Sequence, residues 1–336
     1  MTQRTAVVTG ACGFLGSHLS DRLLADGWRV IGVDSLEDYY PREYKLRAID
    51  SARALGADRF TLLETNLLEL GQSGSVGFEA LTQAVAQAHV VFHLAAQAGV
   101  RASWGRDFRI YTDNNVLGTQ LLLEAAKAQG IERFVYASTS SVYGDTDVLP
   151  MIETAVCRPF SPYGVSKLAG EHLCGLYWRN FGVPTVALRF FTVYGPRQRP
   201  DMGFHRFIRM MMEGRSIPVY GDGSQTRDFT YVSDIVNGLV AAADASPGEL
   251  CNLGGGSRVS LLEALEVLGD IIGSAPTLDM REKQAGDVRD TFASLEHSHS
   301  VLGYRPEVGL REGLTAEVAW LAGISAEPGF PWGVGL

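Results

Sequence analysis

The chain has 336 residues, of which 46% are hydrophobic and 20% are charged. This composition excludes disordered and collagen-like proteins, and the length suits either one large α/β unit or two closely packed ones. The net charge is −9 and the chain has no long basic block, so we expect neither a nucleic acid nor an anionic membrane surface as a partner.

The four cysteines, Cys12, Cys157, Cys174 and Cys251, are widely scattered and lack metal-ligand spacing. We therefore expect reduced thiols, a cytoplasmic location and no metal site. A strand-like run follows the first four residues at once, so no targeting segment is expected there. The longest uncharged stretch, residues 80–100, contains glutamines and histidines, which a lipid-facing helix would not tolerate. We expect a soluble protein.

Five short β-rich runs alternate with helical stretches in the first half of the chain. Leu15, Leu19 and Leu23 recur every four residues and so share one face of the first helix, which Gly27 ends. Alternating strands and helices predict a parallel sheet covered by helices on both faces. The predicted strands are residues 6–9, 29–33, 60–63, 89–94 and 134–137.

The second half begins with a helix that Ser161 caps, with Pro162 at its first position, followed by a strand over 185–190. After residue 191, glycine and proline separate short elements, which suggests loops lining a site. The pattern of residues 231–253 predicts one more helix followed by one more strand of the main sheet. Residues 255–336 are predicted to be helical and rich in loops.

A glycine-rich segment, TGACGFLG, occupies residues 9–16 between the first strand and the first helix. Such a turn lets a pyrophosphate approach the backbone at a helix N-terminus, although it can also be a turn without a ligand. Asp34 ends the second strand, 18 residues after Gly16. An acid at this spacing binds the adenosine ribose and repels a 2′-phosphate, although it can also be a plain loop residue. Together the two features favour NAD over NADP.

Tyr163 and Lys167 are four residues apart and share one helical face. An ammonium near a phenol lowers the tyrosine pKa and provides a base near neutral pH. Chance can also produce such a pair in a chain with 12 tyrosines. Thr139 follows the fifth strand at the sheet edge where ligands bind in α/β proteins. Its hydroxyl can share the substrate oxygen, and the alternative is an ordinary serine-rich turn.

Seven motifs occur in order along the chain, namely TGACGFLG, VFHLAA, DNNVLGT, STSSVYG, SPYGVSK, LRFFTVYGP and TRDFTYVSD. In these motifs the chain resembles the extended short-chain dehydrogenase/reductases of the NAD-dependent sugar-nucleotide epimerase/dehydratase family, over nearly its whole length. The resemblance implies a Rossmann-like doubly wound parallel sheet with a smaller C-terminal substrate-binding α/β domain. It places the NAD-binding domain at 1–190 plus about 229–254, and the nucleotide-sugar-binding domain at about 191–228 plus 255–336.

The resemblance also implies a role for particular residues. Thr139, Tyr163 and Lys167 match the catalytic trio. The residues that match NAD contacts are Gly10, Gly13, Phe14, Leu15, Gly16, Asp34, Ser35, Asn66, Leu67, Leu94, Ala95, Ala96, Asn115, Tyr163, Lys167, Phe190 and Val193. Asn66 stands where the family usually has aspartate.

The expected substrate contacts are Arg101, Ser140, Ser141, Thr192, Arg199, Tyr220, Arg227 and Asp287. Among them, Arg227 matches a pyrophosphate ligand, Asp287 a ribose ligand and Tyr220 a uracil contact. Gln284 replaces an arginine that some relatives use on phosphate.

The family shares a first step in which hydride leaves sugar C4 for NAD while the tyrosine takes the C4 hydroxyl proton. After the fifth strand, dehydratases of the family have a sequence like Thr-Asp-Glu and UDP-glucuronate decarboxylases a sequence like Thr-Ser-Glu. This chain has Thr139-Ser140-Ser141 at the same place. Serine of ordinary pKa cannot supply the acid and base that dehydration needs, so the resemblance predicts C4 epimerisation.

Residues 93–101 and 194–202 are most like UDP-glucuronate 4-epimerases, which implies conversion of UDP-glucuronate to UDP-galacturonate. Arg199 is the first candidate and Arg101 the second to grip the sugar carboxylate, because the planar guanidinium can bind both oxygens. Thr192, Ser140 and Ser141 can add hydroxyl contacts.

Other interpretations remain open. The nearest is a UDP-glucose or UDP-N-acetylglucosamine 4-epimerase, and a UDP-glucuronate decarboxylase comes next. A catalytically silent NAD-binding regulator is a different class, against which the intact trio argues. The resemblance further implies a homodimer through the helix carrying Tyr163 and the helix near residues 115–130. Leu121, Leu122, Ala125 and Ala126 could form its apolar face or simply be core.

Overall fold

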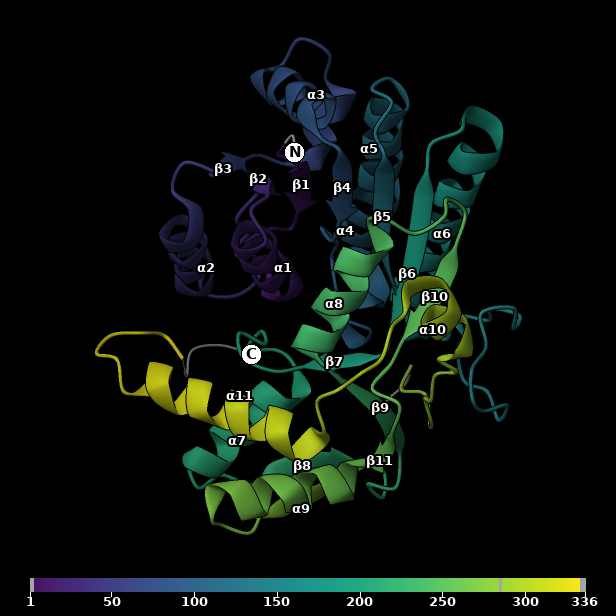
Figure 1. Cartoon of the computed structure of the whole chain (residues 1–336). Helices are drawn as coiled ribbons and strands as arrows, with labels where there is room; N and C mark the ends of the chain where they lie inside the picture. The colour runs from purple at the N-terminus through teal and green to yellow at the C-terminus, as the bar shows by residue number, and fades with distance from the viewer. Residues whose placement is uncertain (1–2, 284–285, 333–336) are drawn as a thin grey trace.

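A seven-stranded sheet forms the centre of the computed structural model, which describes residues 3–283 and 286–332 (Figure 1). The strand order is β10-β6-β5-β4-β1-β2-β3 and every neighbouring pair is parallel. The chain continues from β1 to β2 and β3 on one side and then crosses to β4 on the other side of β1. This reversal of the strand order opens a crevice at the carboxyl ends of β1 and β4. The strands are β1 (Thr5–Thr9), β2 (Arg29–Asp34), β3 (Phe60–Glu64), β4 (Val90–His93), β5 (Arg133–Thr139), β6 (Thr185–Phe190) and β10 (Leu250–Leu253).

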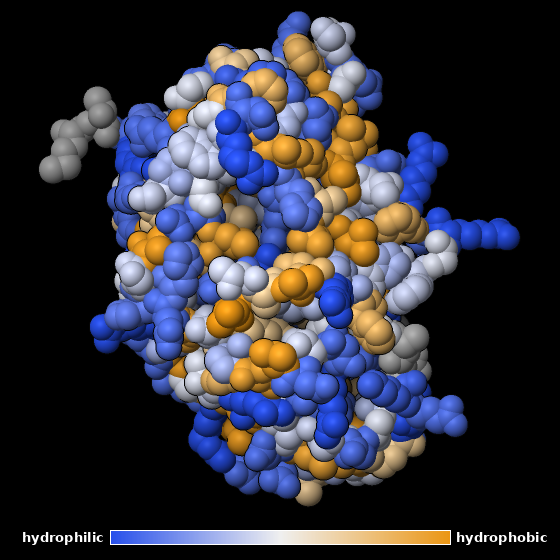
Figure 2. Space-filling view, turned by 90° about the vertical axis from the view of Figure 1, so that its right-hand side faces the viewer, coloured by the Kyte–Doolittle hydropathy of each residue, from blue (hydrophilic) through white to orange (hydrophobic). Residues whose placement is uncertain are grey.

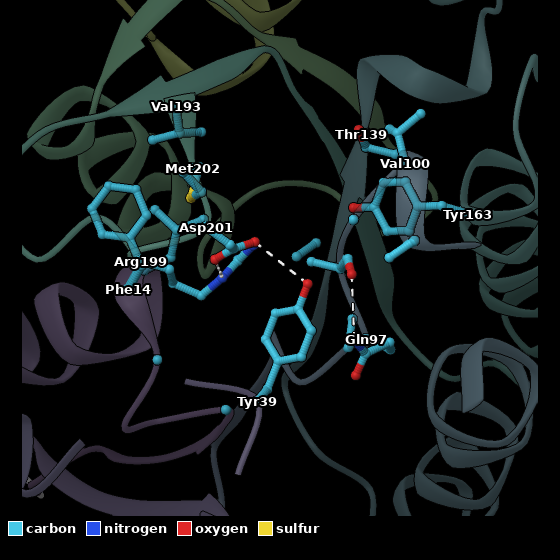
Figure 3. A pocket seen from close by; sticks show the side chains of 18 of the residues that line it. Phe14, Tyr39, Gln97, Val100, Thr139, Tyr163, Val193, Arg199, Asp201 and Met202 are labelled. Carbon is cyan, nitrogen blue, oxygen red and sulfur yellow. Dashed lines mark hydrogen bonds and ion pairs between the residues drawn. The ribbon is translucent and has the colours of Figure 1, made fainter. Parts of the chain in front are cut away.

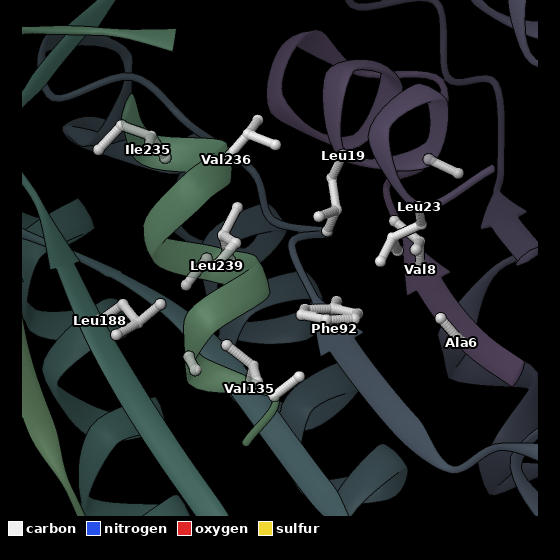
Figure 4. Packing of buried hydrophobic residues seen from close by; sticks show 14 of the residues in the cluster. Ala6, Val8, Leu19, Leu23, Phe92, Val135, Leu188, Ile235, Val236 and Leu239 are labelled. Atoms are coloured by element: carbon white, nitrogen blue, oxygen red, sulfur yellow. The ribbon is translucent and has the colours of Figure 1, made fainter. Parts of the chain in front are cut away.

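Helices cover both faces of this sheet, as Figure 1 shows. One face carries α1 (Phe14–Ala25), α2 (Arg42–Gly56) and α8 (Val232–Ala242), and the other carries α3 (Val76–Gln87), α5 (Gly118–Lys127) and α6 (Pro162–Phe181). Val8 packs toward α1 and α8, beside Leu19 and Leu239 (Figure 4), whereas its neighbour Val7 belongs to the core on the opposite face. Because both faces of the central strands β1 and β4 are buried, the interiors of these strands are apolar runs.

Short helical segments connect the larger elements near the carboxyl edge of the sheet. They are η1 (Leu67–Gly71), η2 (Arg101–Ser103), η3 (Gly105–Asp107), α4 (Phe108–Tyr111), η4 (Thr112–Leu117) and η5 (Ser140–Val142). The one-turn segment α4 and the π-helical segment η4 lead directly into α5.

A second group of elements lies at the carboxyl edge of the sheet. It contains a three-stranded sheet of β7 (Thr192–Tyr194), β9 (Thr226–Tyr231) and β11 (Arg258–Ser260), and a pair of β8 (Ile217–Tyr220) and β12 (Leu278–Arg281). The helices α7 (Gly203–Met212), α9 (Leu261–Ile272) and α11 (Leu310–Ser325) surround these strands. Phe204, Leu265 and Leu314 form part of their separate hydrophobic core.

The sequence predicted these elements closely, and the predicted fold class is confirmed. Ser161 caps α6 through a hydrogen bond from the Gly164 N–H, with Pro162 at the first position. The two-domain division remains a proposal, which the separate core of the second group supports. One helix of the predicted second domain, α10 (Glu296–Leu302), packs instead against β10 and α8 of the main sheet.

Two further expectations can be compared with the structure. Leu122 and Ala126 are buried in the core of the main sheet, so they belong to the interior of the chain and not to an exposed face. Among the described residues, no helix is both long enough and apolar enough to span a bilayer.

Candidate active site

A cavity of about 890 Å³ opens at the carboxyl ends of the main strands, between the sheet and the second group of elements. It extends from the glycine turn after β1 to the start of α6 and to the loops around α7. Most residues singled out from the sequence line it, although they come from segments far apart in the chain. Those lining residues are Gly10, Gly13, Phe14, Leu15, Gly16, Asp34, Ser35, Asn66, Leu67, Leu94, Ala95, Ala96, Arg101, Thr139, Ser140, Ser141, Tyr163, Lys167, Phe190, Thr192, Val193, Arg199, Tyr220 and Asp287.

The glycine turn is shaped for close approach of backbone segments. Gly10 has a φ of 68°, and a Cβ there would lie 2.9 Å from the Ala95 nitrogen. Gly13 caps α1 without any side-chain hydrogen bond, so the first N–H groups of the helix have no side-chain acceptor. These groups border the cavity, where a helix N-terminus favours a phosphate-sized anion. The turn therefore fits the pyrophosphate of a dinucleotide.

Asp34 ends β2 at the rim of the same crevice. Its carboxylate accepts hydrogen bonds from the backbone N–H groups of Cys12 at 3.0 Å and Leu36 at 2.9 Å. Because a carboxylate offers about four acceptor positions, capacity remains for ribose hydroxyls. Asn66 instead uses its carbonyl oxygen to cap η1, accepting from the Leu68 N–H at 2.9 Å. The amide thus has a structural role where the family usually has aspartate.

The predicted trio lines one wall of the cavity. Thr139 at the end of β5 and Tyr163 on α6 lie close together there (Figure 3), and Lys167 follows Tyr163 on the same helix. The sequence pattern led us to expect a lowered tyrosine pKa. Burial has the larger effect and raises the pKa of Tyr163, while Arg199 and Thr139 act in the opposite direction. Burial also lowers the pKa of Lys167 to about 8. Desolvation therefore outweighs the groups that lower the pKa of this phenol, and the lowered tyrosine pKa expected from the lysine is not found in this structure.

The opposite wall carries an arginine held by an aspartate (Figure 3). The Nε and Nη2 atoms of Arg199 donate to the two oxygens of Asp201 at 2.9 and 2.8 Å. The Tyr39 hydroxyl donates to the same carboxylate at 3.4 Å. The Nη1 edge of the guanidinium does not take part in this pair, so it can meet a ligand in the cavity. Across the cavity, the positive charge of Arg199 opposes the burial that raises the pKa of Tyr163.

Three of the predicted substrate residues form a cluster at the mouth of the cavity. Arg101 pairs with Asp287 at 2.6 Å, and its guanidinium lies 4.4 Å from the centre of the Tyr220 ring. The sequence positions of these residues are far apart, and only the fold brings η2, β8 and the loop before residue 290 together. A ligand that binds Arg101 or Asp287 has to compete with this ion pair.

Two predicted contacts lie away from the cavity lining. The Asn115 side chain is buried and bonds to Gln97 and to the Ser166 hydroxyl, so it positions the loop after β4. Arg227 donates to the backbone carbonyls of Val288 and Arg289. It supports the loop that carries Asp287 and does not reach the cavity in this structure. Gln284 lies outside the described residues.

Sequence reasoning did not identify Asp201 and Tyr39 as site residues. Asp201 lies in a segment whose resemblance was noted, residues 194–202, whereas Tyr39 lies in the loop after β2. However, 162 residues separate them, so no local spacing could reveal their hydrogen bond. A signal was present in the closeness of Asp201 to Arg199, because an acid two residues from an arginine can pair with it.

Comparison with known proteins gives consistent results over most of the chain. The profile of the NAD dependent epimerase/dehydratase family matches residues 6–254. The chain is 43% identical over 321 residues to an uncharacterised UDP-glucose epimerase, YtcB, of Bacillus subtilis (strain 168), covering 95% of this chain and 98% of that protein. It is 35% identical to a UDP-glucuronate 4-epimerase of Thermodesulfobacterium geofontis (strain OPF15), covering 94% and 95%.

Solved structures agree with these relatives. The UDP-glucuronic acid 4-epimerase of Bacillus cereus, in complex with UDP-glucuronic acid and NAD, superimposes with a TM-score of 0.88 at 41% identity. The alignment covers 94% of this chain and 98% of that chain. Fold and sequence therefore lead to the same family.

Proposed function

Because this chain belongs to the NAD-dependent epimerase/dehydratase family, we propose that it is an enzyme that inverts C4 of a UDP-sugar, converting UDP-glucuronate to UDP-galacturonate. The observation that carries the choice of sugar is Arg199, whose guanidinium lies on the cavity wall opposite Tyr163. A cation at this place can bind the carboxylate of an acidic sugar while the tyrosine faces its C4 hydroxyl.

Residues of the glycine turn, Asp34 and the segment Leu94 to Ala96 would hold NAD. When bound, this cofactor accepts hydride from sugar C4 and returns it. The half-buried Tyr163 takes the proton of the C4 hydroxyl, and the Lys167 ammonium stabilises the resulting phenolate. The Thr139 hydroxyl holds the same substrate oxygen and keeps it within reach of the tyrosine. After the 4-keto sugar turns over and presents the other face of C4 to the returning hydride, the tyrosine gives its proton back to the C4 oxygen.

The residues after Thr139 support epimerisation over dehydration. Ser140 and Ser141 line the cavity, at the positions where the dehydratases of the family have Asp-Glu. Hydroxyls of ordinary pKa can bind the sugar but cannot exchange protons at C5 and C6. The 4-keto sugar then has no route to elimination through these residues, so hydride return completes the cycle.

A second candidate is UDP-glucose 4-epimerisation, which the similarity to the Bacillus subtilis protein favours. Incubating the purified enzyme separately with UDP-glucuronate, UDP-glucose and UDP-N-acetylglucosamine, and separating the products by chromatography, distinguishes the candidates. We expect UDP-galacturonate as the main product and the slowest turnover with UDP-N-acetylglucosamine. Faster turnover of UDP-glucose than of UDP-glucuronate would identify the enzyme as a UDP-glucose 4-epimerase. A UDP-pentose as the main product would indicate a decarboxylase.

We also propose that the enzyme is a homodimer formed through α6 and the α4–α5 region. Side chains that are about half exposed, Ile110, Leu117, Val165 and Leu176, lie on these neighbouring helices. Figure 2 faces the side of the molecule that carries α6, and hydrophobic residues gather in a band along the middle of it. A second copy with the same band would bury it in a two-fold arrangement.

We further propose a cytoplasmic location. All four cysteines are unpaired in the structure, as is usual in a reducing compartment.

A further inference from the structure

A chain of buried hydrogen bonds runs just behind the cavity lining and has His93, the last residue of β4, at its centre. His93 is 1% exposed, and its register partner on β1 is Thr9. The Thr9 hydroxyl lies 2.8 Å from His93 Nδ1, and the Thr119 hydroxyl on α5 lies 2.9 Å from Nε2. The proposed function leaves this histidine without a role, although it belongs to the VFHLAA motif.

The partners of Thr119 decide which ring nitrogen carries the proton. The Thr119 hydroxyl donates to the Asn115 backbone carbonyl at 2.7 Å, so its one proton is used and it accepts from His93 Nε2. In a neutral ring Nδ1 then has no proton, and it accepts from the Thr9 hydroxyl. Burial, with a smaller effect of the Lys167 charge, lowers the pKa of His93 to about 3. The imidazole is therefore neutral at pH 7, with its proton on Nε2.

One end of this chain reaches the segment that is expected to contact NAD. The Thr9 hydroxyl accepts a hydrogen bond from the Ala95 N–H at 3.1 Å. Ala95 lines the cavity next to Gly10, where an added Cβ would lie 2.9 Å from the Ala95 nitrogen. The hydrogen bond therefore holds the segment after β4 against the glycine turn.

The other end reaches the turn of α6 that carries Tyr163. Asn115 Nδ2 donates to the Ser166 hydroxyl at 2.9 Å, and this hydroxyl donates to the Tyr163 backbone carbonyl at 2.7 Å. Asn115 and Ser166 are both buried, and Asn115 lies in the π-helical segment η4, a form that is frequent at functional sites. A buried chain in which every donor has an acceptor makes the segments that it joins rigid.

We propose that His93 is a positioning residue, which as a neutral imidazole protonated at Nε2 connects the glycine turn after β1 to the turn of α6 that carries Tyr163. His93 is absent from the cavity lining, so it acts through Thr119 and Asn115. The catalytic consequence rests on the proposed function, because that function makes Tyr163 the base. The hydrogen bonds and the position of the proton are independent of any substrate.

Thr119 allows the most selective change in this chain. Thr119→Val removes the hydroxyl and leaves the His93 Nε2–H buried without an acceptor. Thr119→Ser keeps the hydroxyl and should keep the chain. Thr185→Val is the matched control, because the buried Thr185 hydroxyl also donates to a helix carbonyl, that of Cys174 at 3.1 Å, away from the cavity lining.

The first measurement follows the His93 ring by NMR in protein labelled with ¹⁵N at histidine, because the ¹⁵N shift distinguishes a protonated ring nitrogen from a bare one. The chain has seven histidines, and the signals lost in His93→Gln assign this ring. If that variant does not fold, the signal that changes in Thr119→Val assigns it. From pH 6 to 8 we expect a proton on Nε2 and none on Nδ1 in wild type and Thr119→Ser. The Nε2 signal should change in Thr119→Val and stay unchanged in Thr185→Val.

The second measurement separates positioning from folding. Thr119→Val and Thr185→Val should both be less stable in urea unfolding, because each loses a buried hydrogen bond. Only Thr119→Val should also lose kcat, by about tenfold or more, since a small displacement of a catalytic group costs up to about a hundredfold in rate. The KM for the UDP-sugar should change little, and Thr119→Ser should keep the wild-type kcat. If Thr119→Val does not fold, Thr9→Val takes its place, with the change expected at Nδ1.

A proton on Nδ1, or titration of His93 between pH 6 and 8, would overturn the proposal. It would also be overturned if no histidine signal changed in Thr119→Val, or if Thr119→Val and Thr185→Val had the same kcat. The expected NMR result in a protein that turns over no UDP-sugar would reject the proposed function and leave the hydrogen-bond chain standing.

Discussion

Arg199 is the single residue on which the proposed choice of sugar depends. Oxidation of UDP-glucuronate at C4 creates a β-keto acid, which loses CO₂ when the C5–carboxylate bond aligns with the carbonyl π system. An epimerase has to hold that bond out of alignment while the ring turns over. Asp201 occupies the Nε and Nη2 edge of Arg199, so the remaining edge has a defined direction for gripping the carboxylate.

We predict that Arg199→Ala weakens binding of UDP-glucuronate about ten- to a hundredfold, which corresponds to about 1.5–3 kcal/mol for one charge-assisted contact. UDP-glucose, which lacks the carboxylate, should be affected much less, and some UDP-pentose should form from the acidic sugar. Steady-state kinetics with both sugars measures the difference. Arg197→Ala is the matched control, because Arg197 pairs with Asp21 away from the cavity lining. Equal losses for both sugars would assign Arg199 to the diphosphate.

Glu317 is a second informative residue, because it is buried with only one oxygen bonded. One oxygen accepts from the Gly195 N–H at 2.8 Å, the other has no hydrogen-bond partner, and burial raises the pKa of the carboxyl well above its usual value. The folded state therefore binds this proton more tightly than the unfolded chain. The contribution of this carboxyl to the free energy of unfolding is fully present below about pH 4.3, the pKa in the unfolded chain. It is lost as the pH rises through the higher pKa of the folded state.

We predict that Glu317→Gln, which resembles the protonated carboxyl, removes this part of the pH dependence. Urea unfolding at pH 5 to 8 should show the wild type losing at least about 1 kcal/mol relative to the variant as the pH rises, because a pKa difference of one between the folded and unfolded states corresponds to about 1.4 kcal/mol. Parallel stability curves for the two proteins would contradict the raised pKa.

Among the elements, α6 has the most direct connection to the site. It presents Tyr163, Lys167 and Glu171 from its first turns, and its start is fixed by the Ser161 cap. The helix begins at the cavity and packs against β5 and α5. The position of its first turn therefore decides where the predicted base lies relative to Thr139.

We predict that Ser161→Ala destabilises the protein by about 1 kcal/mol, the usual cost of a lost N-cap, and also lowers kcat. Ser75→Ala is the matched control, because Ser75 caps α3 in the same way through the Phe78 N–H. The control should lose similar stability in urea unfolding and keep its kcat. If both variants keep kcat, the cap contributes to folding only.

At the scale of the whole molecule, we predict a dimer with twice the 36.4 kDa mass of the chain. Val165→Asp places a charge in the middle of the proposed interface and should give a monomer in light scattering. Val76→Asp is the control, because Val76 is 87% exposed on α3, away from α6. A wild-type protein that is monomeric at micromolar concentration, or a control that also dissociates, would reject this interface.

The elements themselves were predictable because their causes are local. Apolar runs, the Leu15-Leu19-Leu23 spacing, Gly27 and the Ser161-Pro162 start depend on neighbours in the chain, and the strands and helices lie close to where these patterns placed them. The glycine turn was predictable for the same reason, since Gly10 adopts a positive φ that other residues avoid. Family, cofactor class and reaction class followed from motifs of this local kind.

Interactions across the sequence were decided only by the tertiary structure. The pairs Tyr39 with Asp201 and Arg101 with Asp287 join segments more than 150 residues apart. The pKa of Tyr163 is raised by desolvation, which depends on how the folded chain buries this side chain. Asn115 and Arg227 matched contact motifs, yet their side chains bond to the protein itself. A motif specifies residue types and their local backbone, whereas direction, pairing and burial of a side chain depend on every element packed around it.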